Sequence, residues 1–158
     1  KMDLSRAHAL VKTPVVGELL LEVFANNFWE NLANVQGDPA SIPSDVMEVY
    51  RRPLDDSGNA KAPLALMRMV SDGPDHPNAG APRDIERYVD GLQIPVELVW
   101  GMSDPILANG LAAMETNFPT APVTRTDAGH LLQEEVPAVI AGAVIRVVNA
   151  VNLTTADI

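Results

Sequence analysis

Cysteine is absent from this chain, and phenylalanine, tyrosine and tryptophan together make up only 4% of it. Without cysteine there is no disulfide, no thiolate nucleophile and no cysteine-bound metal, so the sequence carries no mark of a redox compartment. Long apolar runs are missing too. The stretch 15–24 is interrupted by Gly17, Glu18 and Glu22, and it is shorter than the roughly 20 apolar residues that span a bilayer. We expect a soluble protein without a membrane segment; a cytoplasmic location is favoured, although the compartment stays open.

Basic residues are also scarce, since 11 lysines and arginines stand against 21 aspartates and glutamates. The formal net charge of −10 opposes binding to a phosphate backbone, because lysine and arginine supply most of the affinity for nucleic acids. Nucleic acid is therefore not an expected partner. What is present fits one folded domain: 158 residues, of which 47% are hydrophobic and 20% are charged.

The first part of the chain has the pattern of short helices joined by loops. Apolar residues recur at helical spacing over 14–25 and predict a helix there. A second helix is predicted over 43–52, with Pro53 as its end. The prolines and glycines of 55–83 predict a long irregular connection, followed by a short helix at 84–88.

The second part has the pattern strand, helix, strand, helix. The apolar run 94–100 predicts a strand buried on both faces of a parallel sheet, and 121–129 predicts a second strand. Helices are predicted over 107–118 and 134–149. A helix between two strands predicts that the strands are parallel. Because two strands alone do not make a stable sheet, we expect its other strands to come from residues outside this chain.

Asp104 and His130 each follow one of the predicted strands. The carboxyl ends of parallel strands face one crevice, and neighbouring strands lie about 4.8 Å apart. A hydrogen bond between the two side chains is therefore expected, although 26 positions separate them. A carboxylate on one ring nitrogen fixes the tautomer of the histidine and leaves the other nitrogen to act as a general base. The pair supplies two members of a catalytic triad.

A structural role would account for the same residues. A histidine at a turn can bond a loop carbonyl, and an aspartate before proline commonly starts a turn. Spacing leaves both interpretations open. Glu134 and Glu135, in the first turn of the last helix, suit the positive end of the helix dipole and need no catalytic role.

Two blocks of sequence carry a family resemblance. They are "VELVWGMSDPIL" (96–107), with its G-x-x-D-P turn, and "FPTAPVTRTDAGHLLQEEVPAVIAGAVI" (118–145), with A-G-H-x-x-Q-E-x-P. Together they resemble the C-terminal third of α/β-hydrolases, most closely the branch of haloalkane dehalogenases and epoxide hydrolases. "TPVVGELLLEVFANNFWENL" (13–32) and "MEVYRRPLDDSGNAKAPLAL" (47–66) look like parts of the helical cap of haloalkane dehalogenases.

The resemblance implies an α/β fold made of two parts. Residues 1–90 would form a helical cap, and 91–158 would form the C-terminal part of an α/β-hydrolase core, a parallel sheet with flanking helices. The N-terminal core strands would then be absent from this chain. It further implies catalytic roles for Asp104 and His130, with His130 activating the water that hydrolyses an ester intermediate. The nucleophile is expected on an N-terminal portion, because no G-x-S-x-G or G-x-D-x-x-G turn occurs here.

The implied substrate is small and apolar, its carbon–halogen bond is cleaved, and no metal or organic cofactor is expected. Phe28 and Trp29 are candidates to line the substrate pocket, as is Leu131 beside the histidine. Packing between cap and core is the alternative for the two aromatic residues. An epoxide hydrolase or a serine esterase on the same fold is an alternative enzyme. A non-catalytic ligand-binding protein, receptor or processed fragment is an alternative of another class.

Overall fold

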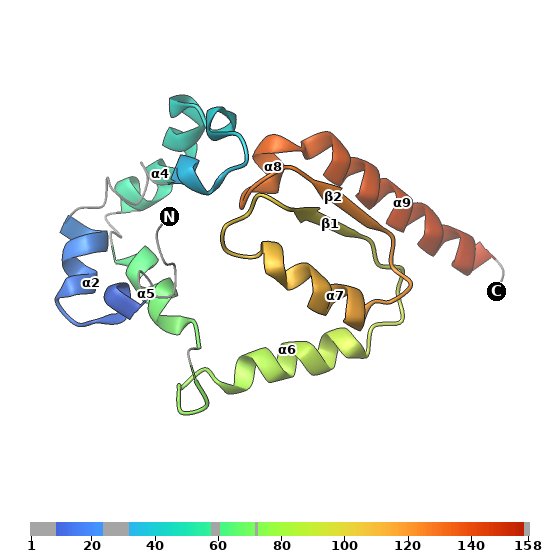
Figure 1. Cartoon of the computed structure of the whole chain (residues 1–158), viewed down its shortest axis with the longest axis horizontal. Coiled ribbons are helices and arrows are strands. Elements are labelled where there is room, and N and C mark those ends of the chain that lie inside the picture. Colours follow the sequence, from blue (N-terminus) through green and yellow to red (C-terminus); the bar gives the residue numbers. More distant parts are fainter. Residues whose placement is uncertain (1–8, 24–31, 58–60, 72, 157–158) are drawn as a thin grey trace. The chain divides into compact units, whose positions relative to one another are not determined.

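The computed structural model describes residues 9–23, 32–57, 61–71 and 73–156 (Figure 1). The chain divides into two compact units, which are described separately. Unit 1 comprises Lys1–Leu32 and Ile42–Gly91, and unit 2 comprises Ala33–Ser41 and Leu92–Ile158. A boundary was expected near residue 91; the division adds that the short segment 33–41 belongs with the C-terminal residues. The fold is mixed α/β, with a parallel sheet in unit 2.

After helical residues 9–12, unit 1 has a distorted helix where a regular one was predicted over 14–25. A short α-helix, α2 (Val16–Glu18), continues as a π-helical turn, η1 (Leu19–Val23). Val15, just before α2, has φ 70°, a left-handed conformation that is strained for a β-branched residue. A regular helix cannot pass through such a residue, so the helix starts only after it. The predicted end lies outside the described residues.

Helix α4 (Ser44–Ser57) extends beyond the predicted end, so the prediction that Pro53 stops it is wrong. Proline inside a helix removes one hydrogen bond and costs about 3 kcal/mol. Two ion pairs bridge the proline: Arg51 to Asp55 at 3.0 Å and Arg52 to Asp56 at 3.3 Å. Pairs of this kind contribute about 0.3–0.5 kcal/mol each, so they offset only part of the cost. The turn around Pro53 is therefore the weakest of α4.

Two further helices of unit 1 are described. Helix α5 (Ala62–Met69) occupies part of 55–83, which was wrongly predicted to be irregular. Its proline lies in the first turn, where the missing N–H breaks no bond, so that proline marks a helix start. Leu64 of α5 is only 2% exposed and belongs to the core of unit 1. Helix α6 (Gly80–Asp90) is longer than the predicted turn at 84–88.

Two parallel strands form the sheet of unit 2, as predicted. Strand β1 (Leu98–Gly101) pairs with β2 (Val123–Thr126), with Leu98 opposite Val123 and Gly101 opposite Thr126. Between them come a short 3-10 turn, η4 (Ala108–Gly110), and α7 (Leu111–Asn117). Both strands are shorter than predicted. The expectation that β1 is buried on both faces is wrong for this structure, because only Gly101 of β1 is buried.

The last predicted helix is two helices, α8 (Leu132–Glu135) and α9 (Pro137–Ala156). Val136 separates them with φ −131° and ψ 46°, because a residue before proline is driven out of the helical region. In Figure 1 the strands run between α7 and α9. The apolar face of α9 remains largely uncovered, since Val144 is 56% and Val148 is 51% exposed.

Segment 33–41 contains two 3-10 turns, η2 (Ala33–Val35) and η3 (Pro39–Ser41), joined by a bend at 36–38. Gln36, between them, is 7% exposed and is one of the few buried polar residues of the described chain. No helix in the described ranges is both long enough and apolar enough to cross a membrane.

Candidate functional site

The candidate site lies just beyond the carboxyl ends of β1 and β2. The two strands stay connected after their last paired residues, because Met102 donates its N–H to the Thr126 carbonyl at 2.9 Å. Ser103 donates in the same way to the Ala128 carbonyl at 3.1 Å. These bonds bring the turn that carries Asp104 alongside the loop that carries His130. We call residues 127–131 the histidine loop.

Asp104 is held in place at both carboxylate oxygens. Its Oδ1 accepts the Ile106 N–H at 2.7 Å, a turn in which the aspartate side chain bonds the backbone two residues on. Its Oδ2 lies 3.0 Å from Nδ1 of His130. The side chain of Asp104 is 4% exposed, and a buried carboxylate is tolerated where such partners satisfy it. The turn at Asp104–Pro105 was predicted, and it aims the carboxylate at the histidine.

The hydrogen bond expected between Asp104 and His130 is present. Since a carboxylate only accepts hydrogen bonds, the proton of the neutral imidazole must lie on Nδ1, and Nε2 then carries a lone pair. Within the described part of the chain, no residue bonds Nε2, and the His130 side chain is 30% exposed. A ring so oriented can take a proton from a water molecule, which is the requirement for a general base. The catalytic roles themselves stay predictions.

Segment 33–41 holds the main chain of the histidine loop. His130 donates its N–H to the Val35 carbonyl at 2.9 Å. Leu131 is bonded twice by the amide of Gln36: its N–H reaches Oε1 at 2.8 Å, and its carbonyl accepts from Nε2 at 3.2 Å. The sequence reasoning missed Gln36. Its polar side chain in a loop, 95 positions from Leu131, gives no local signal of this contact.

Glu135 gathers three backbone N–H groups with one carboxylate. Its Oε1 accepts from Gly129 at 2.7 Å and from Gly37 at 3.0 Å, and its Oε2 accepts from Asp38 at 2.8 Å. Glu135 therefore does more than suit the helix dipole, and these contacts were not predicted from the sequence. The carboxylate joins the residue before His130 to segment 33–41, and hydrogen bonds to a charged acceptor are the strong ones.

Two glycines allow this close approach. A Cβ atom on Gly129 would overlap the carbonyl oxygen of Val35 and the backbone of Gln36. A Cβ atom on Gly37 would overlap the carbonyl oxygen of Asp127. The histidine loop and segment 33–41 are thus in direct backbone contact, which a larger residue at either glycine would prevent.

The residues predicted to bind substrate are only partly placed. Leu131 is half-buried next to His130, as its position in the sequence requires. Phe28 and Trp29 lie outside the described residues, so their roles stay predictions. Groups of three or more potential metal ligands are absent from the ranges that the structure describes.

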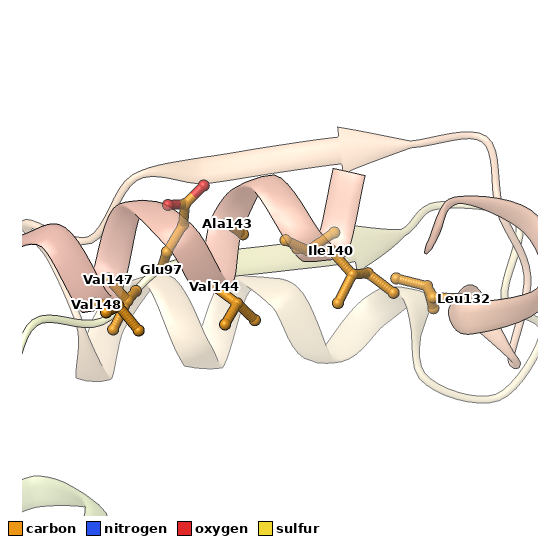
Figure 2. Close-up of a pocket in the computed structure, with 8 residues that line it drawn as sticks. Glu97, Leu132, Ile140, Ala143, Val144, Val147 and Val148 are labelled. Atoms are coloured by element: carbon orange, nitrogen blue, oxygen red, sulfur yellow. The ribbon is translucent and has the colours of Figure 1, made fainter. Parts of the chain in front are cut away.

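An open groove of about 400 Å³ lies along α9, away from the Asp104–His130 pair. Figure 2 shows Ile140, Val144, Val147 and Val148 along α9, with Glu97 beside them and Leu132 of α8 at the other end of the groove. Neither member of the pair, nor Leu131, lines this groove. Its polar group is Glu97, whose side chain is 5% exposed and forms a bidentate ion pair with Arg146. The hydrogen bond from Arg146 lowers the pKa of Glu97 below its ordinary value, and Glu97 in turn raises the pKa of Arg146.

None of the protein families, curated proteins and solved structures compared with the chain matches it.

Proposed function

We propose that this chain carries the general base and the acid of a hydrolase of the haloalkane dehalogenase type. The observation that carries the proposal is the 3.0 Å contact between His130 Nδ1 and Asp104 Oδ2, with the opposite edge of the ring accessible. The sequence blocks around both residues resemble the corresponding part of α/β-hydrolases. This resemblance supports hydrolysis as the type of reaction. Unit 1 would then be the helical cap, and unit 2 the C-terminal part of the hydrolase core.

The proposed reaction has two steps. A carboxylate nucleophile displaces halide from a small apolar haloalkane and forms an alkyl ester. His130 Nε2 then takes a proton from a water molecule, whose oxygen attacks the ester carbonyl. The imidazolium returns the proton to the departing alkoxide, which leaves as the alcohol. The second proton of the water remains on the nucleophile as a carboxylic acid and is then lost to solvent, so that the nucleophile is again a carboxylate and the net products are alcohol, halide and one proton. Asp104 stabilises the imidazolium and keeps Nε2 facing the water.

The nucleophile is proposed to come from an N-terminal portion, on the same polypeptide or on a companion one. Phe28, Trp29 and Leu131 are proposed to line the apolar pocket for the substrate. No metal or organic cofactor takes part in the proposed steps. The mechanism requires only the proton transfers and the covalent ester.

The test uses the natural protein that contains this chain together with its nucleophile, and a short bromoalkane as substrate. His130→Gln retains a polar side chain but removes the base, so ester formation continues and ester hydrolysis stops. We expect release of about one equivalent of bromide per site, and a mass increase equal to the alkyl group on the nucleophile. His76→Gln makes the same change in unit 1 and is expected to turn over like the parent.

The outcomes separate the alternatives. A serine esterase needs its histidine in the first step as well, so His130→Gln would form no covalent adduct from an ester substrate. A binding protein would turn over neither substrate, before or after the substitution. The proposal is refuted if folded His130→Gln, checked by circular dichroism against His76→Gln, releases bromide continuously at the parental rate.

A further inference from the structure

We infer that Glu135 and Gln36 are positioning residues for His130: they clamp the histidine loop onto segment 33–41 and thereby set the ring against Asp104. The inference deepens the proposed function and takes its catalytic meaning from it. Its structural content, the dependence of the His130 ring on two distant side chains, can be measured without turnover.

The ring and the main chain of His130 are held by different partners. Asp104 bonds the ring at Nδ1 and approaches from the turn after β1. The main chain is bonded at three consecutive N–H groups, those of residues 129–131, by Glu135, Val35 and Gln36 in that order. A hydrogen bond weakens steeply once its geometry is lost. Release of the main chain would therefore loosen the contact between the ring and Asp104.

A carboxylate suits the place of Glu135 better than an amide does. All three groups that meet it are donors, and its two oxygens accept all three. A glutamine at this position has one oxygen and one NH₂ group. In one orientation of the amide, the NH₂ group faces the N–H of Asp38. In the other orientation, it faces the N–H groups of Gly37 and Gly129. At least one donor loses its acceptor in either orientation. Glu135→Gln thus changes the clamp while almost preserving size.

Gln36 supplies the second half of the clamp. Its amide bonds both the N–H and the carbonyl of Leu131, and its Nε2 also lies 3.3 Å from the hydroxyl of Ser41. Because Gln36 is 7% exposed, water cannot readily replace these bonds. Methionine has nearly the same shape and makes none of them, so Gln36→Met removes the contact with the residue after His130.

The experiment measures the tautomer of the His130 ring by ¹⁵N NMR at a pH where the ring is neutral. The chain has three histidines, so single substitutions assign the ring signals. In the parent we expect the Nδ1–H form to dominate. In Glu135→Gln we expect the ratio of Nδ1–H to Nε2–H to fall about tenfold, which corresponds to about 1.4 kcal/mol lost from the contact with Asp104. Glu134→Gln, the same change one residue earlier, should keep the parental ratio.

The inference is overturned if Glu135→Gln keeps the parental tautomer ratio, even when its melting temperature falls, because Glu135 would then stabilise the fold without positioning the ring. If Glu135→Gln does not fold, Gln36→Met provides the test. We expect the same fall in the ratio of the Nδ1–H to the Nε2–H tautomer. An unchanged ratio in Gln36→Met would overturn the inference. A shifted ratio in a protein that releases no bromide supports the clamp and refutes only the proposed reaction.

Discussion

Replacing Gly129 with alanine tests how tightly the histidine loop is held against segment 33–41. The new Cβ would overlap backbone atoms of residues 35–37, which cannot rotate away as a side chain would. To relieve the overlap, the two segments must separate. That separation breaks the bond from His130 N–H to the Val35 carbonyl and the bond from Leu131 N–H to Gln36, at 2.9 and 2.8 Å.

The expected cost follows from these two bonds. A hydrogen bond contributes about 0.5–1.5 kcal/mol, and a buried donor left without a partner costs more. The loss of both gives a destabilisation of about 2–4 kcal/mol. Gly142→Ala is the matched control in the same unit. Gly142 lies inside α9, and its nearest neighbour, the Arg146 guanidinium, is 3.4 Å from the new Cβ, so alanine should stabilise the helix by about 0.5–1 kcal/mol.

Urea unfolding followed by tryptophan fluorescence measures both changes. The chain has two tryptophans, so Trp29→Phe leaves Trp100, in β1, as a probe of unit 2. The indole of Trp100 is held by a bond from Nε1 to the Leu107 carbonyl at 3.1 Å. The reasoning is refuted if Gly129→Ala stays within about 1 kcal/mol of the parent while Gly142→Ala shows its gain.

Two further predictions concern charged groups of unit 2. Under the proposed function, Asp104→Asn should lower turnover by about 10³ to 10⁴-fold, because an amide N–H facing Nδ1 of His130 favours the tautomer that carries its proton on Nε2. Steady-state bromide release measures this change, and a loss below tenfold would contradict the role proposed for Asp104. The hydrogen bond from Arg146 lowers the pKa of Glu97 below its ordinary value of 4.5. The ion pair therefore stabilises the fold fully above pH 4.5. This stabilisation is lost as the pH falls through the lowered pKa of Glu97. Glu97→Gln should therefore be less stable than the parent at neutral pH and approach it in acid, as urea unfolding across the pH series will show; a stability difference that grows in acid would contradict the assignment.

The sequence predicts the contact between Asp104 and His130 better than it predicts the helices. Parallel strands place their carboxyl ends together, and that rule alone brings Asp104 to His130. The helix ends depend on finer balances. Proline disfavours a helix interior, yet α4 continues through Pro53, whereas the proline of α5 opens a helix that composition alone suggested was a loop. The sequence around a proline indicates that a helix interior is unfavourable for it. The sequence does not decide whether a helix ends at that proline, continues through it or begins with it.

The contacts of Gln36 and Glu135 could not be predicted from the sequence. Each joins residues more than 90 positions apart, at sequence separations of 95 and 98, through backbone N–H groups that every residue except proline has. A glutamate in the first turn of a helix has an adequate local explanation in the helix dipole. The second role of Glu135, accepting backbone N–H groups of segment 33–41, becomes visible only in the structure, where Gly37 and Gly129 permit the close approach.

The hydrogen bond from Gly37 N–H to Glu135 joins residues that the ribosome adds at different times. The partners are 98 positions apart, and at about 5–20 residues per second the ribosome adds the glutamate roughly 5–20 s after the glycine. Over that interval Gly37 and Asp38 lack the carboxylate that accepts their N–H groups in the folded protein. Both strands and the histidine loop itself are translated before α8 supplies the carboxylate. The three bonds that Glu135 accepts are therefore later than the other elements of the site, and nascent chains that stop short of Glu135 lack these bonds.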